Sequence, residues 1–144
     1  WRRETRSTRN QIMAITEDEA TESRSSVAVC LDTILKYEGI SRNTQRRLNQ
    51  GDTVMDILES DLQNHTILDL SGCSLDAVLY YVNKDVPVLA MLEDGNAVLI
   101  TGFNELNIVV MDPVAGTLEK RGMNDSTEWL AENGNQFISY IRKE

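Results

Sequence analysis

The amino-acid sequence predicts an α+β fold in which an N-terminal half made of helices precedes a C-terminal antiparallel sheet. Two observations support this prediction. Apolar residues repeat at helical spacing through much of the first half, whereas the second half changes to short, β-branched apolar runs separated by turn residues. The chain has 144 residues, of which 41% are hydrophobic. This length allows one continuous buried core, so we expect a single globular domain.

The first predicted helix covers residues 27–38. Ser25 and Ser26 both suit its N-cap, apolar residues follow at helical spacing, and Gly39 stands where a left-handed C-terminal cap belongs. The other elements expected in this half are helices at 44–49 and at 54–62, the second capped by Asp52 or Thr53, a short strand at 66–70, and a helix at 75–83 capped by Ser74.

Three apolar, β-branched runs dominate the second half. They cover residues 86–92, 97–103 and 107–111, and the short polar segments between them predict consecutive antiparallel strands. Asp112-Pro113 ends the third run. The remaining expected elements are a strand at 117–121, a short helix starting at Ser126, and a final strand at 137–141.

The N-terminal residues differ in charge from the rest of the chain. We expect residues 1–24 to form an arm or linker and residues 25–144 to form the domain, because the chain opens with an arginine-rich polar run like a segment cut from a longer protein. Four arginines against Glu4 give the first ten residues a net charge of +3. Because the formal net charge of the whole chain is −9, the remaining residues carry −12. A body this acidic repels phosphate backbones and anionic lipid, so no nucleic-acid partner is expected.

Other classes of protein and site are excluded on composition. No apolar stretch approaches the roughly 20 residues of a membrane-spanning helix, so this fragment is not expected to insert into a membrane. Cys30 and Cys73 are too few for a disulfide framework, and the single histidine, His65, leaves no metal-ligand spacing. We therefore expect neither a metal nor another cofactor.

Four motifs in a fixed order carry a resemblance to a known family. They are Lys36-Tyr37-Glu38-Gly39 at the end of the first helix, the strand led by Pro87, the run Gly95–Phe103, and the strand ending in Asp112-Pro113. Across about residues 25–141, the chain resembles the papain-like cysteine peptidases of the bacteriocin-processing type, which also occur in ABC exporters. The resemblance implies a papain-like fold with a cleft between its helical half and its sheet.

The resemblance also assigns catalytic positions. The family uses a thiolate at a helix N-terminus, an imidazole and a side chain that orients it. Its cysteine position falls at or near Ser26 and its histidine position on Asn96, while the orienting residue is kept as Asp112. Because an asparagine cannot accept a proton from a serine, acyl transfer is not expected here. The family's oxyanion glutamine is also missing, since Gln11 lies too far upstream.

Single residues have structural interpretations beside the functional ones. Cys30 lies on the apolar stripe of the first helix, which predicts core packing. Cys73 lies beside a helix start, where thiol reactivity is favoured, but a plain loop or half-buried cysteine is the preferred interpretation. His65 precedes a strand and is expected at the surface, and Asp112 before a proline is a common turn starter. The aromatic residues that suit either core packing or a ligand groove are Tyr80, Tyr81, Trp129, Phe137 and Tyr140.

The leading hypothesis is a catalytically inactive peptidase-like domain that binds a peptide or partner protein through the inherited cleft, which Ser26, Asn96 and Asp112 would line. One alternative is an active cysteine peptidase or acyltransferase that uses Cys30 or Cys73, and a dyad of His65 with Cys73 is one form of it. Another is a structural module of a larger cell-envelope protein. The resemblance slightly favours an extracytoplasmic or cell-envelope location in a Gram-positive bacterium.

Overall fold

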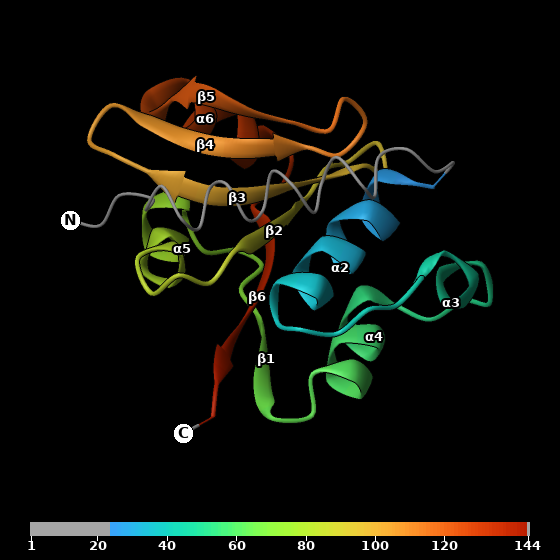
Figure 1. The fold of residues 1–144 in the computed structure, drawn as a ribbon. Helices are drawn as coiled ribbons and strands as arrows, with labels where there is room; N and C mark the ends of the chain where they lie inside the picture. Colours follow the sequence, from blue (N-terminus) through green and yellow to red (C-terminus); the bar gives the residue numbers. More distant parts are fainter. Residues whose placement is uncertain (1–23, 144) are drawn as a thin grey trace.

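The computed structural model describes residues 24–143 and shows the predicted combination of helices and an antiparallel sheet (Figure 1). The helices of the N-terminal half pack against a sheet built mostly from the C-terminal half. Almost all of the predicted N-terminal arm, including Gln11, lies outside the described residues. Within residues 24–143, no helix is long and apolar enough to cross a membrane.

Helix α2 (Ser26–Tyr37) is the central element of the helical half, and its first ten residues are all buried. The hydroxyl of Ser25 accepts a hydrogen bond from the Ala28 N–H at 3.2 Å, which caps the helix as predicted. At the other end, Gly39 has φ +87° and the Ile40 N–H reaches back to the Leu35 carbonyl at 2.7 Å. This is the left-handed C-terminal cap that the sequence indicated.

The next three elements lie close to their predicted bounds. They are α3 (Gln45–Asn49), α4 (Val54–Asp61) and β1 (His65–Asp69). The start of α4 is defined by a reciprocal pair of hydrogen bonds at 3.1 Å, in which Thr53 caps the Asp56 N–H and the Asp56 carboxylate accepts from the Thr53 N–H. Of the two cap candidates for this helix, Thr53 is therefore the one used.

The six strands found within residues 24–143 form one sheet with the order β1-β6-β2-β3-β4-β5, in which every neighbouring pair is antiparallel. The predicted consecutive strands are confirmed as β2 (Val88–Met91), β3 (Ala97–Phe103), β4 (Asn107–Asp112) and β5 (Thr117–Gly122). The last strand, β6 (Gln136–Arg142), does not extend this series but inserts between β1 and β2. The strand that closes the chain thus joins the two parts of the sheet.

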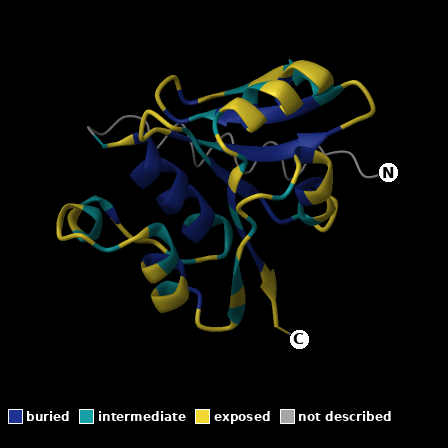
Figure 2. Cartoon of the chain, turned by 180° about the vertical axis from the view of Figure 1, so that it is seen from behind, coloured by how far each residue is buried: buried dark blue, intermediate teal, exposed yellow. Residues whose placement is uncertain are grey.

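Helices cover both faces of the sheet. On one face, α2 and α4 pack against Leu89, Leu99 and Tyr140. On the other face, α5 (Leu75–Val82) and α6 (Met123–Glu132) pack against alternate strand residues such as Val88 and Ile100. Figure 2 shows α2 and the central strands as the most buried elements, while α6 exposes its outer side.

Helix α6 begins earlier than predicted. Its N-cap is Gly122 and its first residue is Met123, so the predicted starting residue Ser126 lies inside the helix and is fully buried. The backbone leaves β5 directly into this helix without a connecting loop. The side chain of Trp129 in this helix contacts Arg121 of β5 and lines the site described next.

Candidate functional site

Ser26 and Asn96, two of the predicted site residues, are in direct contact. Ser26 is the first residue of α2 and is 6% exposed. Its hydroxyl donates a hydrogen bond to Asn96 Oδ1 at 2.9 Å and accepts one from the Ala97 N–H at 3.0 Å. The first turn of α2 is thereby linked to the turn that connects β2 and β3.

A tight turn orients Asn96. Its main-chain N–H donates to Asp94 Oδ1 at 2.9 Å and its side-chain amide donates to Asp94 Oδ2 at 3.1 Å. These hydrogen bonds lower the pKa of the exposed Asp94 carboxyl. Gly95 supplies the positive φ of +88° that the turn needs. With its nitrogen engaged by Asp94, Asn96 presents its oxygen to Ser26.

Asp112 ends β4 and starts a turn. Its Oδ1 accepts hydrogen bonds from the N–H groups of Val114 at 2.9 Å and Ala115 at 3.2 Å, which is the turn-starting role expected of an aspartate before a proline. Asp112 borders the same cavity as Ser26 and Asn96. Within residues 24–143, no hydrogen bond joins it to either of them.

These three residues border a cleft of about 200 Å³ between the start of α2, the β2–β3 turn, the ends of β4 and β5, and α6. We call this cavity the α2–α6 cleft. Its remaining walls are mostly apolar and include two charged residues of β5. The other lining residues are Leu92, Ala97, Val98, Val110, Pro113, Val114, Glu119, Arg121 and Trp129.

The sequence analysis did not identify Glu119 and Arg121 as site residues. They occupy alternate positions of β5, so both side chains lie on the same face of the sheet. The guanidinium carbon of Arg121 lies 3.8 Å from the centre of the Trp129 ring, in a cation–π contact. Strand alternation could have placed the two side chains together, but it could not have placed Trp129 beside them.

The cleft holds hydrogen-bonding groups but no imidazole. The only histidine of the chain, His65, is not among the residues that line it. The hydroxyl hydrogen of Ser26 is directed at an amide oxygen, which cannot act as a base near neutral pH. The arrangement can therefore position polar groups of a ligand, but it offers Ser26 no imidazole for proton transfer.

His65 is not the surface residue predicted from the sequence. It is the first residue of β1, its side chain is 13% exposed, and its Nε2 lies 3.1 Å from Glu38 Oε1. Glu38 also accepts from the Tyr140 hydroxyl at 2.7 Å and from two nitrogens of Arg142 at 3.0 and 2.7 Å. His65 is mostly buried because its ring pairs with the buried carboxylate of Glu38.

Neither cysteine lies in the cleft. Cys30 is fully buried in α2, and burial together with the nearby Asp112 charge raises the pKa of its thiol far above the ordinary value. Cys73 is half-buried and packs against the α5 side of the sheet, whereas His65 contacts Tyr140 on the α2 side. The structure therefore does not bring His65 and Cys73 together as a dyad.

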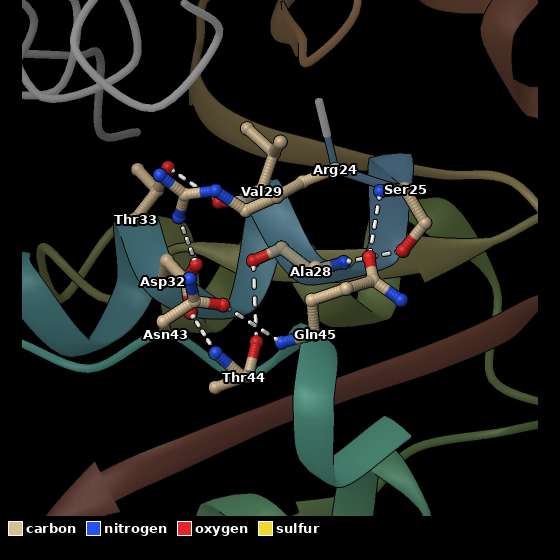
Figure 3. Close-up of polar contacts among 9 residues, drawn as sticks. All are labelled: Arg24, Ser25, Ala28, Val29, Asp32, Thr33, Asn43, Thr44 and Gln45. Carbon is tan, nitrogen blue, oxygen red and sulfur yellow. Dashed lines mark hydrogen bonds and ion pairs between the residues drawn. The ribbon is translucent and has the colours of Figure 1, made fainter. Parts of the chain in front are cut away.

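A polar network, buried at Asp32 and Thr44 and exposed at Ser25, holds the chain just before α2 (Figure 3). Asp32, which is fully buried, accepts hydrogen bonds from the Arg24 guanidinium and, at 2.9 Å, from the Thr44 N–H. The Ser25 N–H donates to the Gln45 side chain at 2.8 Å. These contacts attach the residues preceding Ser26 to α2 and α3, and nothing in the sequence pattern had singled out Asp32.

Three further findings concern ligands and relatives. Among residues 24–143, no group of three or more His, Cys, Asp or Glu side chains is arranged to hold a metal ion. No protein-family model matches the chain, and no curated protein matches it either. Among solved structures, the chain is similar to a Bacillus anthracis protein named as a C39-like peptidase.

That similarity has a TM-score of 0.70 and covers 85% of this chain and 90% of the other, at 16% sequence identity. At this identity, the likeness is evidence about the fold. In this chain the shared fold consists of a helical N-terminal half packed against a largely C-terminal antiparallel sheet. The chain therefore has a C39-like peptidase fold, as the resemblance in sequence predicted.

Proposed function

We propose that this chain is a catalytically inactive peptidase-like domain that binds a peptide segment of a partner protein in the α2–α6 cleft. The observation that carries the proposal is the contact between Ser26 and Asn96 at 2.9 Å. It lies at the positions where the resemblance puts the catalytic cysteine and histidine. Two side chains at these positions are thus within hydrogen-bonding distance, and their types favour a stable hydrogen bond over proton exchange.

The burial of Cys30 argues against a relocated nucleophile. A thiol must ionise and reach its substrate to act as a nucleophile, and Cys30 is fully buried with a pKa raised by that burial. Cys73 packs against apolar residues on the other side of the sheet from His65. The chemistry of the described residues therefore supports binding better than cysteine catalysis.

The lining of the cleft supports a peptide as ligand. The cleft combines apolar side chains with a few convergent polar groups, which is the usual character of a pocket that holds part of a ligand. The side chain of Val114 is 80% exposed at its border, which extends the apolar surface outward. A volume of about 200 Å³ is enough for one or two side chains, not for a large small-molecule ligand.

The proposal can be tested by selecting peptides from a phage-displayed library of random dodecamers against the immobilised chain. Selected peptides are then synthesised and titrated into the ¹⁵N-labelled chain, and the shifted amide signals are assigned. We expect the largest shifts at Asn96, Ala97, Val98 and Val114 and at the Trp129 indole N–H. Failure to enrich any peptide, or shifts confined to α3 and α4, would overturn the proposal.

A further inference from the structure

Two carboxylates of the α2–α6 cleft have acceptor atoms left for a ligand. The exposed side chain of Glu119 makes no hydrogen bond or ion pair with another residue of the described part of the chain, although its backbone pairs with Val110 in the sheet. Asp112 borders the cavity and uses only Oδ1 for its turn, so within residues 24–143 its Oδ2 has no hydrogen-bond partner. By contrast, the oxygens of Ser26 and Asn96 are occupied by their mutual contact and by Ala97.

The pairing of β4 with β5 sets the spacing of these two carboxylates. In the register, Asp112 lies opposite Thr117, and Glu119 is two residues further along β5 on the same face. Diagonal neighbours of this kind have Cα atoms about 7–8 Å apart, a distance at which one cation can approach both side chains. An ammonium or guanidinium group between them would donate one charge-assisted hydrogen bond to each carboxylate.

The positive charge of Arg121 lies to one side of this position. Its guanidinium is stacked on Trp129, which holds it against the ring. Glu119 and Asp112 thus leave a net negative charge on the cleft lining, and Asp94 adds another on the adjoining turn. The apolar residues beside them, Val98, Val114 and Trp129, would accept a neighbouring apolar side chain.

We infer that the cleft selects peptides in which a lysine or arginine stands next to an apolar residue. The basic side chain binds between Asp112 and Glu119, and the apolar side chain packs against Trp129. The inference rests on the proposed function, since it names the class of peptide that the same cleft takes. It also accounts for the acidic character of the chain, because the surrounding field attracts a basic ligand.

The test uses the random dodecamer selection described above. We expect a basic residue beside an apolar one to be enriched in the selected peptides. The best synthetic peptide is then compared with a version in which each Lys or Arg is replaced by glutamine, and both are titrated into the wild-type chain and its Glu119→Gln variant. We expect either change to weaken binding about two- to fivefold, the range typical of one solvent-exposed ion pair, and added salt to weaken it as well.

Glu59→Gln is the matched control, because Glu59 lies exposed on α4, away from the cleft, and the substitution removes the same charge. Equal weakening by Glu59→Gln and Glu119→Gln would reduce the effect to overall charge and overturn the inference. Enrichment of peptides without basic residues, mapped to the same cleft, would overturn it while leaving the proposed function intact. If no peptide is enriched, both the inference and the proposed function are overturned.

Discussion

Ser26 and Asn96 are joined by a hydrogen bond of 2.9 Å at the N-terminus of α2. The Ser26 hydroxyl also accepts a hydrogen bond from the Ala97 N–H at 3.0 Å. The hydroxyl therefore has both a donor and an acceptor role inside the protein. Ala97 is 1% exposed, so no solvent can replace the serine as the partner of its N–H. This relationship makes Ser26 a structural residue whatever ligand the cleft binds.

Ser26→Ala should destabilise the fold. It leaves the buried Ala97 N–H without an acceptor, for which we expect a loss of about 1–3 kcal/mol in the free energy of unfolding. Urea denaturation followed by circular dichroism measures the change. Ser60→Ala on the exposed side of α4 serves as the control and should leave the midpoint unchanged. Equal midpoints for both variants would show that the hydroxyl contributes nothing.

Ser26→Cys combined with Asn96→His should create a reactive thiol. The two side chains already meet, and a helix N-terminus and an imidazolium both lower a thiol pKa. We expect iodoacetamide to alkylate position 26 faster in the double variant than in Ser26→Cys alone, with the rate reaching its plateau at lower pH. Mass spectrometry after timed quenching gives the rates. Identical pH profiles in the two variants would argue that residues 26 and 96 do not face each other in solution.

Cys30 should resist alkylation in the folded chain. It is fully buried and its thiol pKa is raised, so iodoacetamide can reach it only when the structure opens. We expect its labelling at pH 7 to be much slower than in urea, and Cys30→Ala to retain any peptide binding. Rapid, stoichiometric labelling of Cys30, or of Cys73, in the native chain would instead favour the cysteine-enzyme alternative.

Glu38 should make stability depend on acid pH. Burial opposes its ionisation, but hydrogen bonds from Arg142, Tyr140 and His65 outweigh it, so the pKa of Glu38 lies below its ordinary 4.5. A carboxyl with a lowered pKa stabilises the fold above that ordinary value, and the contribution is lost as the pH falls through the folded-state pKa. We therefore expect the unfolding free energy to decline on acidification from about pH 5 downward.

Glu38→Gln isolates this contribution. It should lower the unfolding free energy by about 2 kcal/mol at neutral pH, because Arg142 loses its charged partner, and by less at acid pH. Urea titrations at several pH values give both curves. The exposed Glu59→Gln provides the comparison, and a difference between wild type and Glu38→Gln that does not shrink on acidification would contradict the assignment.

Arg24 and Asp32 should be energetically coupled. Asp32 is fully buried and burial raises its pKa despite the hydrogen bonds from Thr44 and Arg24, so Arg24→Met leaves a carboxylate without its cation. We expect a loss of about 3 kcal/mol for that variant. In the double variant Arg24→Met with Asp32→Asn, the Asp32→Asn change should restore part of the lost stability, since asparagine needs no counter-ion. Strictly additive effects in this double-mutant cycle would show that the pair is not coupled.

Much of the fold could be predicted from local sequence signals. Ser25, Thr53 and Ser74 cap their helices as expected, because a short polar side chain before an apolar helical repeat satisfies the first N–H groups directly. The runs that became β2, β3 and β4 were recognisable from their β-branched residues. Helix α6 was misplaced at its start, since Gly122 is a weak cap signal and Ser126 a strong one.

The candidate site was only partly predictable. Ser26, Asn96 and Asp112 were found through a family resemblance, and they do border one cavity. Glu119 and Arg121 were not identified, and Trp129 was only one of five aromatic residues that suited either the core or a groove. Their place in the cleft depends on β5 pairing with β4 and on the position of α6 beside that edge of the sheet. The paired environment of His65 escaped prediction for the same reason, as Glu38, Tyr140 and Arg142 come from distant parts of the chain.

The sequence by itself determined the helix caps, the strand-forming runs and the types of side chain at the peptidase positions, because these depend on residues that are neighbours along the chain. The tertiary structure alone decided that β6 lies between β1 and β2, that Ser26 bonds Asn96, and that two acidic side chains share one cleft. Such contacts join segments far apart in the chain. They form only when burial of both sheet faces outweighs the entropy lost in closing the long loops between them.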